Sequence, residues 1–240
     1  MKVKVLGVLG GSGLYEPSFI KSPREKKVKT PFGDPSDHLR IGEFGGLRIV
    51  FIPRHGRKHT IPANLVNHEA NVWAMKKEGV SHIVSSSSVG SLKMSIEPGH
   101  FVVPDDFFCF WNVPTVRGDV HHSTPEFDED LRRVLKRAAE TTGGKAHDGG
   151  TYVQTLGPRL ETKAEIRFFK DYGEILGMTM AAEATIACDL EIGYASLCMV
   201  DNYCNGIVPK ALTYAHIVRQ QKVNSGRLTR AMKAAVEMLA

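Results

Sequence analysis

Side chains suited to binding an anion gather at three points of the sequence, each beside an apolar run. Residues 10–13 (Gly-Gly-Ser-Gly) would bring backbone N–H groups and the Ser12 hydroxyl close to a ligand. Arg54 and His55 open a basic stretch that ends at Thr60, and an arginine can hold an oxyanion through two hydrogen bonds. Residues 85–88 are four serines whose hydroxyls need partners if they are buried. Together these segments predict one oxyanion site.

Each segment also has a plainer interpretation, which stays open. Residues 10–13 could be a tight turn, and residues 54–60 a solvated basic turn. The glycine segment fits neither nucleotide-binding motif, because no Gly-Lys-Ser/Thr follows it and Glu16 stands where the dinucleotide fingerprint needs a glycine. For residues 54–60 the break at Gly56 favours a ligand site, since ligands of open α/β sheets bind at the carboxyl ends of strands.

The elements that must position these residues alternate between strands and helices. Near-continuous apolar runs predict strands at residues 3–9, 47–52, 82–86, 101–103, 151–155, 174–178 and 194–200. Helical spacing predicts helices between Thr60 and Gly79, and at residues 131–138, 161–172, 181–190 and 228–239. The alternation predicts an α/β fold, with one domain over residues 1–240 and a central mixed β-sheet flanked by helices on both faces.

Composition and charge argue against several classes of protein. The 240 residues are 42% hydrophobic and 24% charged, as in compact globular domains. Lys plus Arg is 31 and Asp plus Glu is 26, a net charge of +5 that suits small anions, and without a basic arm we expect no nucleic-acid partner. The four cysteines lack zinc or disulfide spacing, which predicts reduced thiols, no metal and a cytoplasmic location. We expect no signal peptide and no membrane span.

The ordered set of motifs resembles the trimeric purine nucleoside phosphorylases, most closely their methylthioadenosine and methylthioinosine phosphorylase branch. The motifs are Gly10-Gly-Ser-Gly-Leu14, Arg54-His-Gly with His59-Thr-Ile-Pro62, Val89-Gly90-Ser91-Leu92, Gly157-Pro-Arg159, Gly177-Met-Thr179 and Tyr194-Ala-Ser196. The resemblance covers about residues 5–240. It implies a nucleoside phosphorylase domain over the whole chain, assembled as a homotrimer or a dimer of trimers.

The resemblance also implies roles for individual residues. Inorganic phosphate would be a co-substrate, with no cofactor and no metal, held by Ser12, Arg54, His55, Ser87 and Ser88. The nucleoside would contact His59, Leu160, Glu161, Met178, Thr179 and Asn202, and the 5′ side of its ribose would meet Tyr214, Ile217 and Val218 on the helix before the last. His121 would reach into the site of a neighbouring subunit. The ring of Tyr214 can cover a methylthio group, and its hydroxyl can bond a 5′-hydroxyl.

The residues expected around the base favour a 6-oxopurine. The methylthioadenosine type has an Asp-Tyr-Asp pattern after the last strand, whereas this chain has Asn202, Tyr203 and Cys204 there. Glu161 stands in Gly-Pro-x-x-Glu-Thr, as in enzymes that act on inosine and guanosine. An ionised Glu161 accepts a hydrogen bond from N1–H of a 6-oxopurine but faces the lone pair of adenine N1. Asn202 can donate to O6 and contact N7, and an ionised aspartate cannot donate.

We therefore predict phosphorolysis of a 6-oxopurine nucleoside to the free base and a ribose 1-phosphate, with 5′-methylthioinosine favoured and inosine and guanosine also used. The candidate catalytic residues are His55, Glu161 and Asn202. Asn202 would stabilise the departing base and Glu161 would orient it. The alternatives are a 5′-methylthioadenosine phosphorylase, a nucleoside hydrolase and a non-catalytic nucleotide-binding protein.

Overall fold

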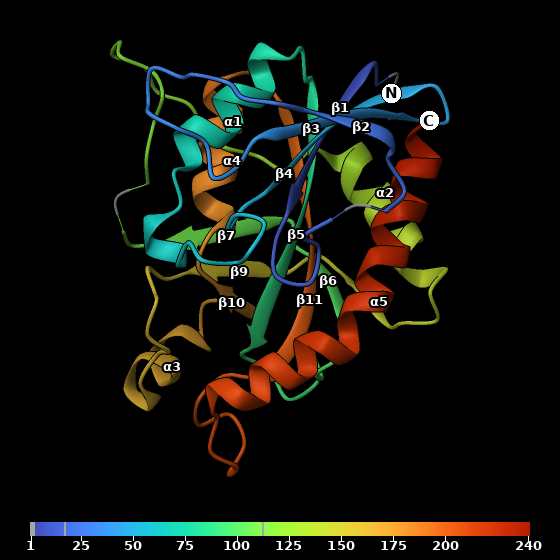
Figure 1. The fold of residues 1–240 in the computed structure, drawn as a ribbon. Coiled ribbons are helices and arrows are strands. Elements are labelled where there is room, and N and C mark those ends of the chain that lie inside the picture. Colours follow the sequence, from blue (N-terminus) through green and yellow to red (C-terminus); the bar gives the residue numbers. More distant parts are fainter. Residues whose placement is uncertain (1–2, 17, 112) are drawn as a thin grey trace.

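A mixed β-sheet forms the centre of the protein in the computed structural model, which describes residues 3–16, 18–111 and 113–240 (Figure 1). Within these residues eleven strands pair in the order β2-β3-β4-β1-β5-β10-β9-β7, and β11, β6 and β8 continue from the other edge of β5. The strands are β1 (Val5–Gly10), β2 (Lys21–Lys26), β3 (Leu39–Phe44), β4 (Leu47–Pro53), β5 (His82–Ser91), β6 (Phe101–Val103), β7 (Asp106–Cys109), β8 (Ala146–Asp148), β9 (Thr151–Gln154), β10 (Ile175–Gly177) and β11 (Gly193–Tyr203).

Helices cover both faces of the sheet. Those of the described residues are α1 (His68–Lys77), α2 (Glu129–Glu140), α3 (Lys163–Phe169), α4 (Met180–Asp189) and α5 (Tyr214–Leu239). The pair α1 and α4 packs on one side, and the pair α2 and α5 on the other (Figure 1). This arrangement confirms the predicted α/β fold with a mixed sheet and helices on both faces.

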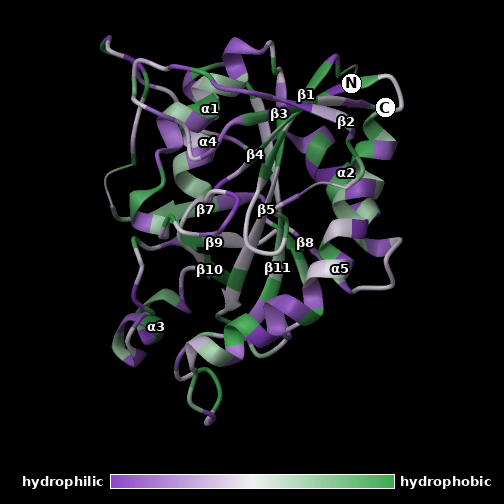
Figure 2. Ribbon diagram, viewed as in Figure 1, coloured by the Kyte–Doolittle hydropathy of each residue, from purple (hydrophilic) through white to green (hydrophobic). Residues whose placement is uncertain are grey.

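Burial on both faces explains the unbroken apolar runs of the central strands. In β1, Leu6 and Val8 pack into the core beneath α2 and α5, whereas Leu9 packs into the core beneath α1 and α4. A strand covered on both sides needs apolar residues at successive positions, not only at alternate ones. The covering helices α2 and α5 instead alternate hydrophobic and hydrophilic residues along their length (Figure 2).

Parallel pairing brings the three predicted anion-binding segments to one place. Strand β1 is parallel to both β4 and β5, with Gly10 opposite Pro53 and Leu9 opposite Ser85. The glycine segment, Arg54 and the serines therefore meet at the carboxyl ends of these neighbouring strands, although about 75 residues separate the first segment from the last.

Several elements differ from the sequence prediction. Strands β2, β3, β7 and β8 were missed, and β2 shows why, since all six of its residues are exposed and its pairing needs no apolar pattern. The helix expected after Thr60 begins only at His68, where the Asn67 side chain accepts a hydrogen bond from Ala70 N at 3.0 Å. Pro62 precedes a short 3-10 turn.

Two elements are longer than predicted, and both lengths affect the site. Helix α5 begins at Tyr214, so the prediction that Tyr214 and Ile217 lie on a separate, earlier helix is wrong. Its apolar spacing marks only the half that packs on the core. Strand β5 continues through the serines to Ser91, and β11 continues through Asn202 to Tyr203. These polar residues belong to strands and not to the turns after them.

Among the described helices, none combines the length and the apolar character that crossing a bilayer requires. Within the same described part of the chain, no group of three or more His, Cys, Asp or Glu side chains is arranged to hold a metal ion.

Candidate active site

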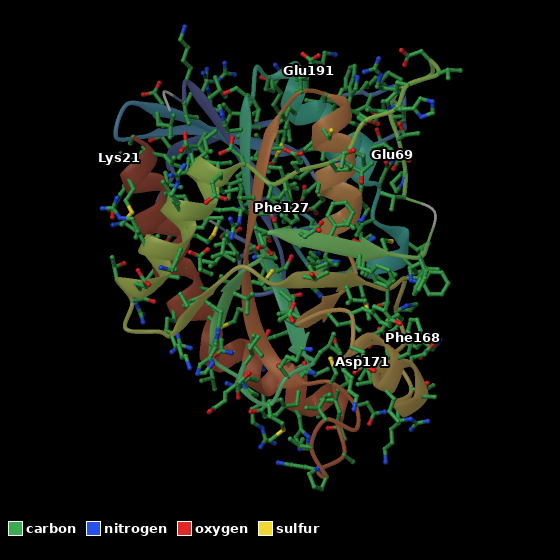
Figure 3. All side chains as sticks on the ribbon, turned by 180° about the vertical axis from the view of Figure 1, so that it is seen from behind. Lys21, Glu69, Phe127, Phe168, Asp171 and Glu191 are labelled. Carbon is green, nitrogen blue, oxygen red and sulfur yellow. The ribbon has the colours of Figure 1, made fainter. Side chains whose placement is uncertain are left out.

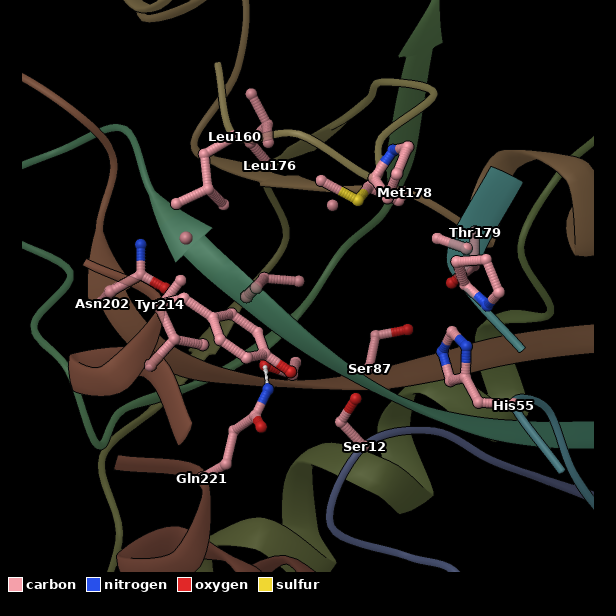
Figure 4. Close-up of a pocket in the computed structure, with 18 of the residues that line it drawn as sticks. Ser12, His55, Ser87, Leu160, Leu176, Met178, Thr179, Asn202, Tyr214 and Gln221 are labelled. Atoms are coloured by element: carbon pink, nitrogen blue, oxygen red, sulfur yellow. Dashed lines mark hydrogen bonds between the residues drawn. The ribbon is translucent and has the colours of Figure 1, made fainter. Parts of the chain in front are cut away.

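A cavity of about 690 Å³ opens where β1 and β4 end against β5 (Figure 4). It brings together most of the site residues predicted from the sequence. The predicted residues that line it are Ser12, Arg54, His55, His59, Ser87, Ser88, Leu160, Glu161, Met178, Thr179, Asn202, Tyr214 and Ile217. A cavity of this size is within the range that encloses small ligands.

Arg54 is the charged centre of one end of the cavity, and Glu183 on α4 holds it. The guanidinium is 1% exposed. Its Nε and Nη2 both donate to the Glu183 carboxylate, and Nη1 donates to the carbonyl oxygen of Ser86 at 2.9 Å. One hydrogen on each of Nη1 and Nη2 remains for a ligand. The Nε edge, which a free arginine could also offer to an oxyanion, is occupied.

The ion pair between Arg54 and Glu183 fixes the charge state of both groups. Burial, the largest single effect, would raise the pKa of Glu183, but the charge and hydrogen bonds of Arg54 together with those of His68 outweigh it and lower that pKa to about 2. Burial would likewise lower the pKa of Arg54, and the carboxylate raises it instead. Tyr194 adds a hydrogen bond to Glu183 Oε2 at 2.7 Å. The pair is thus a rigid, overall neutral dipole beside the cavity.

The glycine segment packs against this pair. A Cβ atom on Gly11 would lie 2.2 Å from the carbonyl oxygen of Ser86 and 2.4 Å from Arg54 Nη1, so only glycine fits there. The N–H group of Gly11 donates to Ser86 Oγ at 3.0 Å, so it is not free for an anion. The segment therefore contributes close packing and the Ser12 side chain to the site.

His55 is a neutral hydrogen-bonding group at the same end. Its Nδ1 lies 2.8 Å from the carbonyl oxygen of Ile61, and a carbonyl only accepts, so Nδ1 carries the proton. Burial and then the charge of Arg54 lower the pKa of His55 to about 4. At neutral pH its Nε2 is consequently an acceptor. The ring of His59 packs on it with centroids 4.6 Å apart, and burial also lowers the pKa of His59.

The four adjacent serines of β5, residues 85–88, do four different things. Ser85 Oγ bonds Ser196 Oγ at 2.8 Å inside the core, and Ser86 serves Gly11. Ser87 Oγ is buried, lines the cavity and has no hydrogen-bond partner among the described residues. Ser88 donates its hydroxyl hydrogen to Asp201. Ser87 is therefore the serine whose hydroxyl is available to a ligand, and the hydrogen of Ser88 is already engaged.

The other end of the cavity holds a carboxylate and an amide. Glu161 is 7% exposed, and its Oε1 accepts a hydrogen bond from Thr155 Oγ1 at 2.6 Å, while Oε2 has no partner within the described part of the chain. Burial raises the pKa of Glu161, against the opposing effect of the Thr155 hydrogen bond. Asn202 Nδ2 donates to the carbonyl oxygen of Tyr203 at 2.9 Å, which leaves one N–H and Oδ1 for a ligand.

Two of the predicted site residues lie outside the cavity lining. Val218 follows Ile217 on α5, and one residue turns a helix by about 100°, so the two side chains cannot face the same cavity. His121 lies apart and places Nε2 at 3.1 Å from Asp189 Oδ1. Its predicted contact with a neighbouring subunit stays a prediction.

Sequence reasoning missed several lining residues. They include Thr60, Ile61, Pro62, Ala63, Pro158, Leu176, Asn205, Leu212 and Gln221. Gln221 could have been found, because it lies four positions after Ile217 and so shares its helical face. Glu183 is a carboxylate within the largely apolar sequence of α4, and nothing in that local sequence indicates that it pairs with Arg54.

Comparisons with known proteins indicate the family of the chain. A profile described as the phosphorylase superfamily matches residues 5–237. A protein of Dictyoglomus turgidum named as a probable 6-oxopurine nucleoside phosphorylase is 38% identical over 96% of this chain and 90% of its own. An S-methyl-5′-thioadenosine phosphorylase of Thermofilum pendens is also 38% identical, over 95% and 89%. The methylthioadenosine phosphorylase of Schistosoma mansoni with bound adenine aligns with a TM-score of 0.91, at 29% identity over 98% and 91%.

Proposed function

The chain belongs to the phosphorylase superfamily and is a purine nucleoside phosphorylase, a pentosyltransferase, and from that premise we propose that its substrates are 6-oxopurine nucleosides. The products would be hypoxanthine or guanine and a ribose 1-phosphate. 5′-Methylthioinosine is the favoured substrate, and inosine and guanosine are used as well.

The position of Glu161 is the observation that carries the choice of base. Glu161 is a buried residue that lines the cavity, and its Oε2 accepts no hydrogen bond from another residue of the described chain. Its neighbour Leu160 and Asn202 lie across the cavity from His55 (Figure 4). N1–H of a 6-oxopurine supplies the missing donor, whereas adenine would bring its N1 lone pair against the carboxylate. A hydrogen bond to a charged group contributes about 1.5–3 kcal/mol, so this contact alone favours the 6-oxopurine by about tenfold or more.

The other end of the cavity supports phosphate as the co-substrate. Ser12 and Ser87 offer hydroxyls, Arg54 offers one hydrogen on each terminal nitrogen, and His55 offers an acceptor for a protonated phosphate oxygen. No carboxylate of the described residues lies free at this end, because Glu183 is bound to Arg54, so a water nucleophile has no carboxylate base there. This favours phosphorolysis over hydrolysis.

Catalysis would follow from charge placed beneath the sugar. As the glycosidic bond stretches, positive charge develops on the ribose, and the phosphate stabilises it before attacking the anomeric carbon. Opposite unit charges about 4 Å apart attract by about 4 kcal/mol at an effective dielectric of about 20. Asn202 would donate its remaining N–H to the departing base, and Glu161 would hold the base in register.

We propose that no metal or cofactor takes part and that the chain assembles with copies of itself. The support for assembly is an exposed aromatic patch, in which Phe110 is 57%, Phe168 46% and Tyr172 54% exposed, an unusual display of apolar surface for a lone subunit. Figure 3 shows Phe168 at the outer edge of the molecule. Light scattering on the purified protein tests this, and a monomer at micromolar concentration would contradict it.

The function is tested by measuring base release from methylthioinosine, inosine, guanosine and methylthioadenosine, each with and without phosphate. We expect base release only with phosphate. Between methylthioinosine and methylthioadenosine, which differ only in the base, we expect kcat/KM to be at least tenfold higher for methylthioinosine. Faster release from methylthioadenosine would make the protein a methylthioadenosine phosphorylase. Equal rates in phosphate-free buffer would show a hydrolase, and tight binding without any release would show a binding protein.

A further inference from the structure

A chain of hydrogen bonds behind the cavity links a buried carboxylate to a side chain inside it. Asp201 on β11 is 4% exposed. It accepts a hydrogen bond from Ser88 Oγ on β5 and one from Asn224 Nδ2 on α5 at 2.7 Å. Gln221 Nε2 in turn donates to Ser88 Oγ at 2.9 Å. Neither group bonded to Asp201 carries a positive charge, so within the described part of the chain the carboxylate has no ion-pair partner.

The direction of each bond in this chain is set by Asp201. An ionised carboxylate only accepts, so Ser88 must give it its single hydroxyl hydrogen. Ser88 can then only accept from Gln221, and Gln221 must present its NH₂ group to Ser88. Asn224 is held in the same sense, because its Nδ2 also lies 3.4 Å from the carbonyl oxygen of Val200.

This order leaves the carbonyl oxygen Oε1 of Gln221 for a ligand. Gln221 lines the cavity from α5, and Figure 4 shows its nitrogen bonded to Ser88, so Oε1 is the atom of the amide that has no partner among the described residues. It shares its helical face with Tyr214 and Ile217, at spacings of seven and four residues. These two were predicted to meet the 5′ side of the ribose. An oriented acceptor on that wall selects a ligand that carries a hydrogen-bond donor there.

We propose that Gln221 is a specificity-determining residue that accepts a hydrogen bond from a donor on the 5′ carbon of the nucleoside, and that Asp201 is the positioning residue that turns it that way through Ser88. The inference rests on the proposed function and deepens it. Ile217 and Leu212 line the same cavity and are apolar, so they can pack against a methylthio group. Gln221 can instead accept a hydrogen bond from a 5′-hydroxyl. The protein is then a phosphorylase of 5′-hydroxyl nucleosides as well as of methylthio ones.

The test compares kcat/KM for three substrates that differ only at the 5′ carbon. 5′-Deoxyinosine lacks any donor, inosine has a hydroxyl that donates or accepts, and protonated 5′-amino-5′-deoxyinosine can only donate. In the wild type we expect kcat/KM for inosine to exceed that for 5′-deoxyinosine by about two- to tenfold, which corresponds to one neutral hydrogen bond. We expect kcat/KM for the ammonium compound to exceed that for 5′-deoxyinosine as well.

Variants then separate the contact from the relay. Gln221→Met should reduce both preferences to about one. Lys222→Met, at the next position of α5, exposed and outside the cavity lining, should leave them within about twofold. Asp201→Asn and Ser88→Ala should each lower the preference for the ammonium compound more than that for inosine, because Gln221 is then free to turn its NH₂ group to the cavity.

Two results would overturn the proposal. One is a Gln221→Met enzyme that slows all three substrates equally or keeps the wild-type preferences. Another is a Ser88→Ala enzyme that keeps the ammonium preference, since the charge of Asp201 and not the relay would then explain it. If Gln221→Met does not fold, Ser88→Ala decides alone. Failure of the wild type to release base from any of the three, with methylthioadenosine cleaved, would instead refute the proposed 6-oxopurine specificity.

Discussion

Replacing Glu161 by glutamine tests how the site distinguishes the two kinds of purine. In the wild type Thr155 Oγ1 donates to Oε1 at 2.6 Å and leaves Oε2 as an acceptor for N1–H. If Thr155 keeps this bond in Glu161→Gln, the new NH₂ group takes the place of Oε2 and points a donor at N1. A 6-oxopurine then loses a charge-assisted hydrogen bond, while adenine gains a donor for its N1 lone pair.

The size of the effect follows from these two changes. Losing the bond to the carboxylate costs inosine about 1.5–3 kcal/mol, and pairing a formerly opposed N1 favours adenosine by about 1 kcal/mol. The ratio of kcat/KM for inosine to that for adenosine should therefore fall by about 60-fold or more. The neutral amide is no harder to bury than the carboxylate, so we expect the variant to fold.

The assay measures base release from inosine and adenosine, and from methylthioinosine and methylthioadenosine, at saturating phosphate. The control is Glu165→Gln, four residues away, where the carboxylate pairs with Arg159 outside the cavity lining. That variant should leave both ratios unchanged. A Glu161→Gln enzyme with the wild-type ratios would show that Glu161 does not contact N1 and would refute the assignment of the base end.

Further predictions concern charge and protonation. Burial raises the pKa of Glu161, so its carboxylate accepts a hydrogen bond at higher pH and loses this ability as acid protonates it. The ratio of inosine to adenosine activity should therefore fall toward acidic pH in the wild type. In Glu161→Gln the ratio should not change with pH. Arg54→Lys keeps a positive charge for Glu183 but loses the terminal N–H groups that face the cavity, so steady-state kinetics should show the phosphate KM rising about tenfold and the nucleoside KM changing little; the opposite pattern would place the anion elsewhere. Glu183→Gln leaves Arg54 buried without its carboxylate and should lower the free energy of unfolding in urea by about 3–5 kcal/mol, and a loss below about 1 kcal/mol would show that the pair is not a structural clamp.

Much of the fold was predictable because it depends on local patterns. Continuous apolar runs marked the strands that are covered on both faces, and three of these, β1, β4 and β5, deliver the residues of the anion end. The missed strands are the ones whose sequence shows no such pattern, as in the fully exposed β2. The early half of α5 was predicted as a separate helix for a related reason, since it lines a cavity and does not continue the apolar spacing of the half that packs on the core.

The chemical types of the site residues were also fixed by the chain, since arginine, histidine, serine and glutamate can do only what their donors and acceptors allow. Their charge states and hydrogen bonds were not. Neighbours in space decide that the positive charge of Arg54 is balanced by Glu183, which lies 129 residues away along the chain, and that His55 is uncharged at neutral pH. They also decide that of four adjacent serines one keeps a free hydroxyl. Burial and hydrogen bonding set these properties, and both arise only when distant segments are packed together.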